Sequence, residues 1–405
     1  MNTELSKVFN EDELLGLTRK LINIPSYTTY KNREKEVALF LEKVFKEEGI
    51  DCYLQQADQE RCNIIATLKG NGTGKSLMLN GHLDTVPVDG MDDPFGAVVK
   101  DGFMYGRGAA DMKSGVAAMA YALILLKRMG AGLDGDLVFA GVIDEEAAKS
   151  TGSRVIAEQG PLTDFAIVGE PTGLFPVIAH KGIDYFEIEF SGKAAHSSLP
   201  KNGANAIFAA AQFITFVREK LVPLYETLIH PLVGAPTINV GLITGSAKIN
   251  QDFLLKKSET FAGVIPDSAT VYVDVRWTPL QSIPEILEHL NQAVNAILPD
   301  NPGVTAEVRY IPLPRPAMEI AQDAKLTSVL LKSTTAISPE TANVKGVSYF
   351  ADSGILYGVG KIQSLVFGPG DIAVAHSIQE RVEVSQIFKA AKIYAETALE
   401  VCINQ

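Results

Sequence analysis

A run of apolar residues typical of a buried strand leads directly to a histidine and an aspartate in the segment Leu77-Met78-Leu79-Asn80-Gly81-His82-Leu83-Asp84. Three later segments have the same order, an apolar strand followed at once by acidic or imidazole groups. In open α/β sheets the ligand crevice lies outside the carboxyl ends of the strands, so these polar side chains are expected to converge. The later segments are residues 138–143 before Asp144-Glu145-Glu146, residues 166–168 before Gly169-Glu170, and residues 365–367 before Gly368-Pro369-Gly370-Asp371 and His376.

Helix-like and strand-like segments alternate around these strands. Residues 109–129, for example, form a long Ala-rich helical pattern between two of them. Strands that alternate with helices form parallel or mixed sheets covered on both faces. We therefore expect an α/β fold with a mixed, mostly parallel sheet and helices on both faces. The other expected helices are 11–21, 33–48 and 151–159, and the expected strands are 62–68, 76–80, 136–143, 165–168 and 364–367.

The middle of the chain has a different pattern. Residues 185–190, 237–243 and 270–276 alternate as half-buried antiparallel strands do. Helical stretches at 204–221 and 283–297 accompany them, and the helix-then-strand pattern returns after about Pro312. We expect one α/β domain, formed by residues 1–182 and 311–405, that is interrupted by an inserted α+β domain at residues 183–310.

The composition is that of a soluble globular protein, because 46% of the 405 residues are hydrophobic and 21% are charged. The net charge of -12 argues against nucleic acid or an anionic membrane as a partner. No apolar stretch approaches the length of a membrane helix, and residues 1–15 lack the order of a signal peptide. We expect a cytoplasmic protein that binds neither nucleic acid nor membrane.

The acidic and imidazole groups point to metal ions. Asp111 adds a further carboxylate, in the Gly-rich turn that opens the 109–129 helical pattern. Taken singly, each such residue is more often a helix cap or a solvated loop charge. Together in one crevice, the carboxylates would repel one another severely without cations. The three cysteines have no CxxC spacing, so the ligands must be imidazole and carboxylate, which suit a dinuclear zinc site with cobalt or manganese as substitutes.

Two pairs of nearby residues suggest a division of labour. Residues i and i+2 point the same way on an extended chain, so Asp84 is expected to hold the far ring nitrogen of His82 and to fix its tautomer. In the pair Glu145-Glu146, one carboxylate can ligate a metal while its neighbour acts as general base for the attacking water. The sequence leaves open which glutamate has which role.

These motifs resemble those of the metallopeptidase family of aminoacylase, acetylornithine deacetylase, succinyl-diaminopimelate desuccinylase and carboxypeptidase G. The likeness covers nearly the whole chain, in the family's order. It implies that Asp111 bridges two Zn²⁺ ions, with His82 and Glu170 completing one site and Glu146 and His376 the other. The segments that carry the likeness are Gly81-His82-Leu83-Asp84-Thr85-Val86-Pro87, Tyr105-Gly106-Arg107-Gly108-Ala109-Ala110-Asp111-Met112-Lys113-Ser114-Gly115, Asp144-Glu145-Glu146, Gly169-Glu170-Pro171-Thr172 and Gly368-Pro369-Gly370-Asp371 with Ala375-His376.

The resemblance also implies roles beyond metal ligation. Glu145 would be the general base, and Asp84 would orient its histidine. The inserted domain would act as a lid and mediate a homodimer. Its segment Gly192-Lys193-Ala194-Ala195-His196-Ser197 is similar to the motif whose histidine, here His196, reaches a neighbouring subunit's active site to stabilise the transition state. Arg276 matches the arginine expected to hold the substrate carboxylate, a task that suits its fork of donors. On their own, these last two residues can also be a solvated loop histidine and a structural ion-pair partner.

The chain departs from the family's pattern within the inserted domain. Gly245-Ser246 stands where the family usually has a pair of glycines. Asn250 is the candidate for the family's substrate-binding asparagine. The stretch from Gln251 to Gly263 then intervenes before Val264-Ile265-Pro266-Asp267. We interpret this stretch as an insertion near the substrate that can reshape specificity.

The expected reaction is hydrolysis of the amide bond of an N-acyl amino acid, as in a deacetylase or desuccinylase, by water activated by two zinc ions. Glu170, rather than an aspartate, is typical of the family's deacylases and carboxypeptidases. One alternative is a dipeptidase or carboxypeptidase that acts on short peptides. Another is a non-catalytic ligand-binding protein on the same fold, although such a protein would be expected to lose metal ligands or the base.

Overall fold

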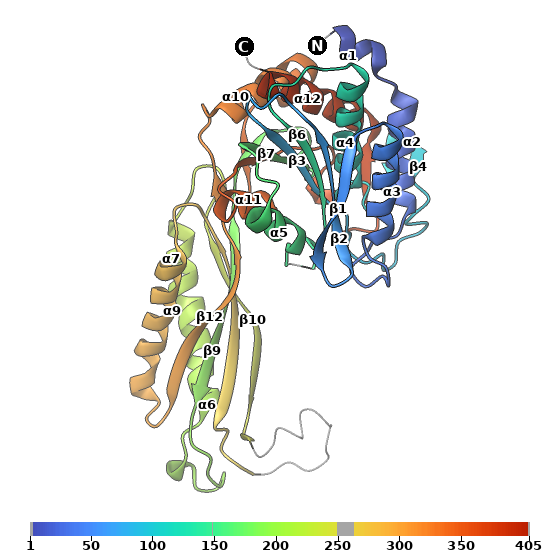
Figure 1. Cartoon of the computed structure of the whole chain (residues 1–405). Helices are drawn as coiled ribbons and strands as arrows, with labels where there is room; N and C mark the ends of the chain where they lie inside the picture. The colour runs from blue at the N-terminus through green and yellow to red at the C-terminus, as the bar shows by residue number, and fades with distance from the viewer. Residues whose placement is uncertain (1–2, 148, 249–262, 404–405) are drawn as a thin grey trace. The chain divides into compact units, whose positions relative to one another are not determined.

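The computed structural model describes residues 3–147, 149–248 and 263–403. It divides into two compact units (Figure 1). The first comprises Met1–Ala179, Met318–Val347 and Ala351–Gln405, and the second comprises His180–Ala317 and Ser348–Phe350. The second unit therefore extends beyond the expected insertion, residues 183–310, at both ends.

The first unit is built on a mixed sheet with a parallel centre. Its strands, in their order across the sheet, are β1 (Asp51–Asp58), β2 (Arg61–Leu68), β6 (Leu137–Val142), β3 (Leu77–His82), β7 (Phe165–Val168), β15 (Gln363–Val366), β8 (Val177–His180) and β13 (Met318–Glu319), and β14 (Lys345–Val347) pairs with β8. Strands β6, β3, β7 and β15 run parallel, whereas β1, β2 and β8 pair antiparallel. The predicted α/β class with a mixed sheet is confirmed.

Helices cover both faces of this sheet (Figure 1). One face packs against α3 (Lys35–Glu47), α4 (Lys113–Arg128) and α12 (Val384–Cys402), and the other against α5 (Thr151–Gln159) and α11 (Ser353–Gly358). Strands β3, β6 and β7 are buried along their whole length as a result. Further helices, α1 (Thr3–Val8), α2 (Glu11–Asn23) and α10 (Lys325–Ile337), pack on α4 or α12. The strands β16 (Arg381–Glu383), β5 (Phe103–Tyr105) and β4 (Val98–Lys100) form a small antiparallel sheet.

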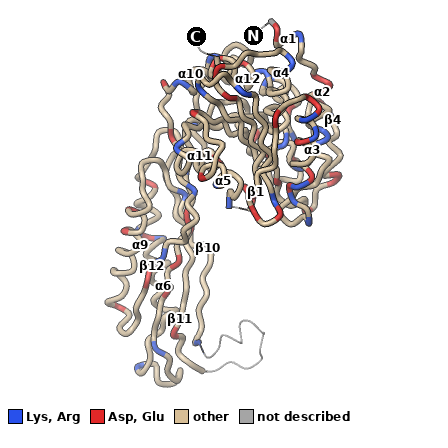
Figure 2. Tube along the Cα trace, in the orientation of Figure 1, with Lys and Arg blue, Asp and Glu red and all other residues tan. Residues whose placement is uncertain are grey.

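The sequences of the outer helices explain which face each one buries. Helix α2 begins after Asn10, whose side chain accepts the N–H of Glu13. It buries Leu14, Leu17 and Leu21, which share one face at helical spacing. The acidic residues of α2 lie in its first turn and a basic residue lies in its last turn, whereas α3 carries both signs along its length (Figure 2). Within the residues that the structure describes, no helix combines the length and the apolar character needed to cross a bilayer.

The second unit is an antiparallel sheet backed by helices. Its strands, in order, are β10 (Thr237–Ser246), β11 (Ser268–Trp277), β9 (Gly182–Ser191) and β12 (Thr305–Arg315), and its helices include α6 (Ala206–Phe216), α7 (Val222–Thr227) and α9 (Ile283–Ile297). Alternate residues of β9 and β11 are buried. They form one apolar core with the helices, which includes Phe186, Val273, Phe213 and Leu290. A sheet with one covered face produces the alternation seen in the sequence.

Three boundaries differ from those expected. The inserted domain was expected to end at residue 310, but strand β12 continues to Arg315. Pro312 and Pro314 lie where the register of β12 with β9 shifts, and an edge strand tolerates proline there. The helix expected at 109–129 begins at Lys113, since the residues before it form a turn. The helix expected at 204–221 is divided into α6 and a π-helical segment, Val217–Leu221.

Candidate metal centre

Two histidines and two carboxylates of the first unit surround Asp111. The Nε2 atom of His82 lies 2.9 Å from Oδ1 of Asp111 and 3.6 Å from Oε1 of Glu170. The Nε2 atom of His376 lies 3.3 Å from Oδ2 of Asp111 and 3.2 Å from Oε1 of Glu146. Each oxygen of Asp111 therefore faces a different histidine, and each histidine has a second carboxylate beside it.

The parallel strands bring these residues to one edge of the sheet. His82 is the last residue of β3, and Glu146, Glu170 and His376 follow β6, β7 and β15. These strands are neighbours in the parallel centre of the sheet. Their carboxyl ends open on the same side, which is where α/β folds place ligands.

Asp111 lies in a tight turn ahead of α4. Gly108 in this turn has a φ of +84°, a conformation that favours glycine. Helix α4 also approaches the end of β7 very closely, because a Cβ atom on Gly115 would lie 2.3 Å from the carbonyl oxygen of Gly169. These two glycines allow the Asp111 turn to sit against the loop that carries Glu170.

The partner that orients His82 differs from the one expected. The Nδ1 atom of His82 lies 2.9 Å from the main-chain oxygen of Asp84 and 3.6 Å from Oδ1 of its carboxylate. Strand β3 ends at His82, so the chain turns and presents its carbonyl to the ring. The carboxylate of Asp84 instead accepts the N–H groups of Glu145 at 3.3 Å and Glu146 at 2.9 Å. With Nδ1–H donated to a carbonyl, Nε2 is the nitrogen available to a metal.

A buried ion-pair network holds the other side of the Glu145-Glu146 loop. Asp144 has a φ of +72°, which a non-glycine residue keeps only when its surroundings hold it there. Arg61 donates to Asp144 at 3.0 Å and to Glu34 at 2.6 Å, and Glu34 accepts the N–H of Asp144 at 3.3 Å. Asn63, also on β2, bonds to the backbone before and after the loop. None of these four residues was among the predicted site residues.

Replacing Arg61 with methionine is expected to lower the free energy of unfolding by about 3 kcal/mol, because the buried carboxylate of Glu34 loses its ion-pair partner and Asp144 keeps only the longer contact with Arg33, at 3.5 Å. The side chains of Glu34 and Asp144 are only 1% and 2% exposed. Urea unfolding at neutral pH measures the change. The matched variant Arg128→Met removes ion pairs at the surface and is expected to cost about 1 kcal/mol or less. Equal costs for the two variants would contradict the prediction.

The pKa shifts in the cluster show that its buried carboxylates favour nearby positive charge. Burial raises the pKa of Glu170 to about 8, and it also raises the pKa of both carboxyls of the Glu145-Glu146 pair. Hydrogen bonds with Asp111 and Glu146 raise the pKa of His376 to about 10. Burial opposes protonation of His82, yet the Glu170 and Asp111 carboxylates raise its pKa well above the usual value. Carboxylates that draw protons onto both histidines form a site that divalent cations would neutralise instead.

The donor set fits divalent transition metals. Ligand atoms of His82, Asp111 and Glu146 all lie within 4.8 Å of one another. Imidazole nitrogens and carboxylate oxygens suit zinc, and also cobalt or manganese. His82 and Glu170 can share Asp111 with one ion, and Glu146 and His376 can share it with a second. Glu145 directly precedes Glu146 in the chain, and the charges of His82 and Glu170 influence the pKa of its carboxyl group.

The site residues predicted in the insertion belong to the second unit. His196 is exposed, and its Nδ1 accepts from the backbone N–H of Ser198 at 3.2 Å, so a neutral ring carries its proton on Nε2. Arg276 lies on β11 with its side chain 41% exposed and its Nε atom 4.0 Å from Asp274. Asn250 and the stretch from Gln251 onward lie outside the described residues, apart from Gly263 at its end.

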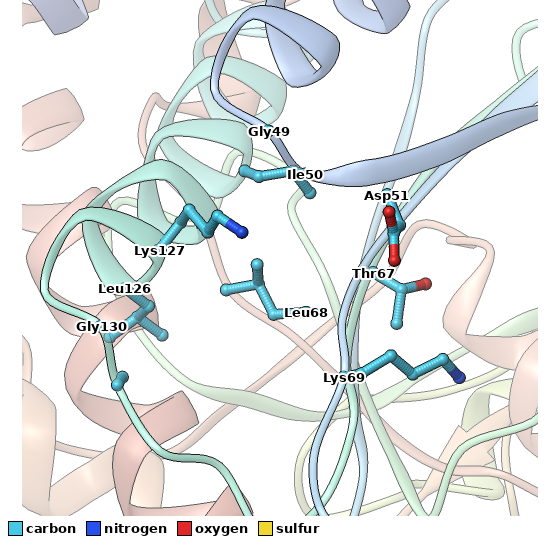
Figure 3. A pocket seen from close by; sticks show the side chains of 10 residues that line it. Gly49, Ile50, Asp51, Thr67, Leu68, Lys69, Leu126, Lys127 and Gly130 are labelled. Carbon is cyan, nitrogen blue, oxygen red and sulfur yellow. The ribbon is translucent and has the colours of Figure 1, made fainter.

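A separate pocket lies on the first unit, between the start of β1, the end of β2 and the end of α4 (Figure 3). Its lining includes Asp51, Lys69 and Lys127. None of the clustered histidines and carboxylates lines it. This pocket is therefore distinct from the cluster around Asp111.

Comparison with known proteins decides the family. The sequence model of peptidase family M20/M25/M40 matches residues 78–400, a span that contains all of the clustered residues. The chain belongs to this family. Its membership confirms the metallopeptidase resemblance read from the motifs, and it makes this M20 chain a hydrolytic enzyme that acts on amides.

Relatives of this M20 chain include deacylases and peptidases. It is 31% identical over 355 residues to the acetylornithine deacetylase of Myxococcus xanthus, covering 86% of this chain and 87% of that one. It is 26% identical over 404 residues to a probable succinyl-diaminopimelate desuccinylase of Staphylococcus epidermidis, covering 93% and 96%. A tripeptidase structure from Staphylococcus aureus superposes with a TM-score of 0.77 at 23% identity, covering 97% of this chain and 99% of that one. This last likeness shows the shared fold.

Proposed function

We propose that this M20 hydrolase is a two-metal deacylase that cleaves the amide bond of N-acyl amino acids. The observation that carries the proposal is the division of the Asp111 oxygens between two histidine–carboxylate pairs. The substrate class rests on the 31% identity to an acetylornithine deacetylase and on a glutamate at position 170. A cytoplasmic location is part of the same proposal.

Two Zn²⁺ ions are the proposed cofactors, with Co²⁺ or Mn²⁺ as substitutes. His82 and Glu170 would hold one ion, Glu146 and His376 the other, and Asp111 both. When bound, the ions would supply Lewis-acid polarisation of the scissile carbonyl and of the attacking water.

The remaining residues would move protons and hold the substrate. Glu145 would take a proton from the attacking water and return it to the leaving amine. Asp84 would keep the loop of Glu145 in place through the two N–H groups that it accepts. His196 of a partner subunit would donate from Nε2 to the developing oxyanion. Arg276 would pair with the free carboxylate of the substrate, and Asn250 would add a hydrogen bond.

A panel assay tests the substrate class. The value of kcat/KM is measured for acetyl-ornithine, succinyl-diaminopimelate, other N-acyl amino acids and dipeptides. We expect the best N-acyl amino acid to exceed the best dipeptide by at least about tenfold, which corresponds to about 1.4 kcal/mol of transition-state binding. The reverse order would make the chain a dipeptidase or carboxypeptidase. No hydrolysis of any amide by the metal-loaded protein would favour a binding protein.

The proposed homodimer is tested by light scattering. The chain has a mass of 43.6 kDa, and the proposal requires twice that mass in solution. A strict monomer that retains full activity would remove the proposed role of a partner's His196.

A further inference from the structure

Glu380 is a buried carboxylate that no step of the proposed chemistry uses. It lies four residues after His376 in the chain and is 0% exposed. Its Oε1 atom accepts the N–H groups of Ala110 and Asp111, each at 3.0 Å. Its Oε2 atom accepts from the guanidinium of Arg107, which is itself 3% exposed.

The same contacts join the two loops that carry Asp111 and His376. The N–H of Gly106 donates to the main-chain oxygen of Glu380 at 3.2 Å. Strand β5 pairs with β16 immediately beside this bond. Arg107 also donates to the main-chain oxygen of Ser377 at 3.4 Å. The Asp111 turn and the His376 loop are therefore one hydrogen-bonded unit with Glu380 between them.

Simple packing does not account for a carboxylate at this position. Apolar residues that replace a buried ion pair are often neutral or stabilising, and Glu380 adds a negative charge close to Asp111, itself acidic. What an apolar side chain cannot do is accept the two N–H groups of the turn. Those groups precede α4 and would otherwise be left without acceptors.

We propose that Glu380 is a positioning residue of the metal centre, whose carboxylate holds the backbone of Asp111 so that its shared oxygens face His82 and His376. The proposal rests on the two-metal function proposed above. Groups that orient a ligand in this way typically change metal affinity 10–100-fold when they are replaced.

The effect is expected to fall unequally on the two metal ions. His82 is buried at the end of a central strand, and its ring is held by the main chain of Asp84. His376 has a side chain that is 52% exposed and a φ of +57°. The position of His376 depends more on the hydrogen bonds of Glu380 and Arg107 that join the His376 loop to the Asp111 turn. The metal ion on the His376 side should therefore be lost first.

The test compares two substitutions by titrating the apo protein with Zn²⁺ and Co²⁺ in a calorimeter. Glu380→Met removes both acceptors and is expected to weaken one metal equivalent about 10- to 100-fold. Glu380→Gln keeps an amide oxygen for the two N–H groups, so its metal affinity is expected to stay within about threefold of wild type. If Glu380 served only as an ion-pair partner of Arg107, the two variants would have the same metal affinity, because both remove the charge that faces Arg107.

Two further variants keep the test decisive. If Glu380→Met does not fold, Arg107→Met combined with Glu380→Met removes the unpaired charge and is expected to lose the same metal equivalent. Asp184→Leu removes a buried carboxylate of the second unit that accepts from Trp277 and Tyr310, and its metal affinity is expected to match wild type within about twofold.

The outcomes separate this proposal from the function on which it rests. Wild-type metal binding at Glu380→Met, or equal losses at the methionine and glutamine variants, would overturn the role of Glu380 alone. A wild-type protein that binds no metal would overturn the two-metal centre itself.

Discussion

Replacing Glu145 with glutamine is expected to lower kcat on the order of 10³-fold while leaving the metal content of the protein unchanged. Glutamine has nearly the same shape but cannot accept a proton from water. The backbone N–H of Glu145 is held by Asp84, so the loop should keep its position. Single-turnover kinetics and metal analysis of the same preparation measure the two effects.

The neighbouring variant Glu146→Gln is the matched control for this prediction. The Oε1 atom of Glu146 lies 3.2 Å from Nε2 of His376. Replacing Glu146 should therefore lower the affinity for one metal ion and also lower kcat. The sequence left the roles of the two glutamates open. If Glu146→Gln kept both metals and Glu145→Gln lost one, the roles would have to be exchanged. Full activity of Glu145→Gln would exclude it as the base.

Replacing Asp111 with asparagine is expected to remove at least one metal ion and to lower kcat/KM on the order of 10³-fold. An amide offers one oxygen, and its nitrogen is a donor that cannot ligate a metal. The two oxygens of Asp111 face His82 at 2.9 Å and His376 at 3.3 Å, so one of these sides must lose its shared ligand. Metal analysis after gel filtration, together with a rate measurement, tests this.

Two comparisons accompany the Asp111 variant. Asp371→Asn makes the same chemical change at an exposed carboxylate that caps a short 3-10 helix, Ile372–Val374, and asparagine caps equally well, so a change within about twofold is expected. A chelator should abolish the activity of the wild type, and added Zn²⁺ should restore it. Retention of both metals by Asp111→Asn would rule out a shared carboxylate.

The fold and the place of the site were readable from the sequence because both depend on local patterns. Apolar runs such as residues 138–142 have the composition of fully buried strands. Parallel pairing then brings whatever follows each run to the same edge of the sheet. The positions of His82, Glu146 and Glu170 thus followed from strand ends alone. The family motifs supplied the roles that strand ends cannot.

The supporting residues were not readable because their partners are distant in the chain. Glu380 bonds to the backbone of Asp111 across 269 positions, and Arg61 reaches Asp144 across 83. A buried charge of this kind looks like a surface charge until its partner is known. The main-chain oxygen of Asp84 lies nearer to His82 than the carboxylate of Asp84 does, and the sequence could not show this because it depends on how the chain turns after β3 ends. Pro312 suggested that the inserted domain ends near residue 310, but β12 is an edge strand and continues through its prolines to Arg315.

Anomalous X-ray diffraction at the zinc edge, on crystals of the metal-loaded protein, locates the metal ions themselves. We expect two zinc peaks separated by the carboxylate of Asp111, one beside His82 and Glu170 and the other beside Glu146 and His376. A single peak, or two peaks that do not share Asp111, would contradict this expectation.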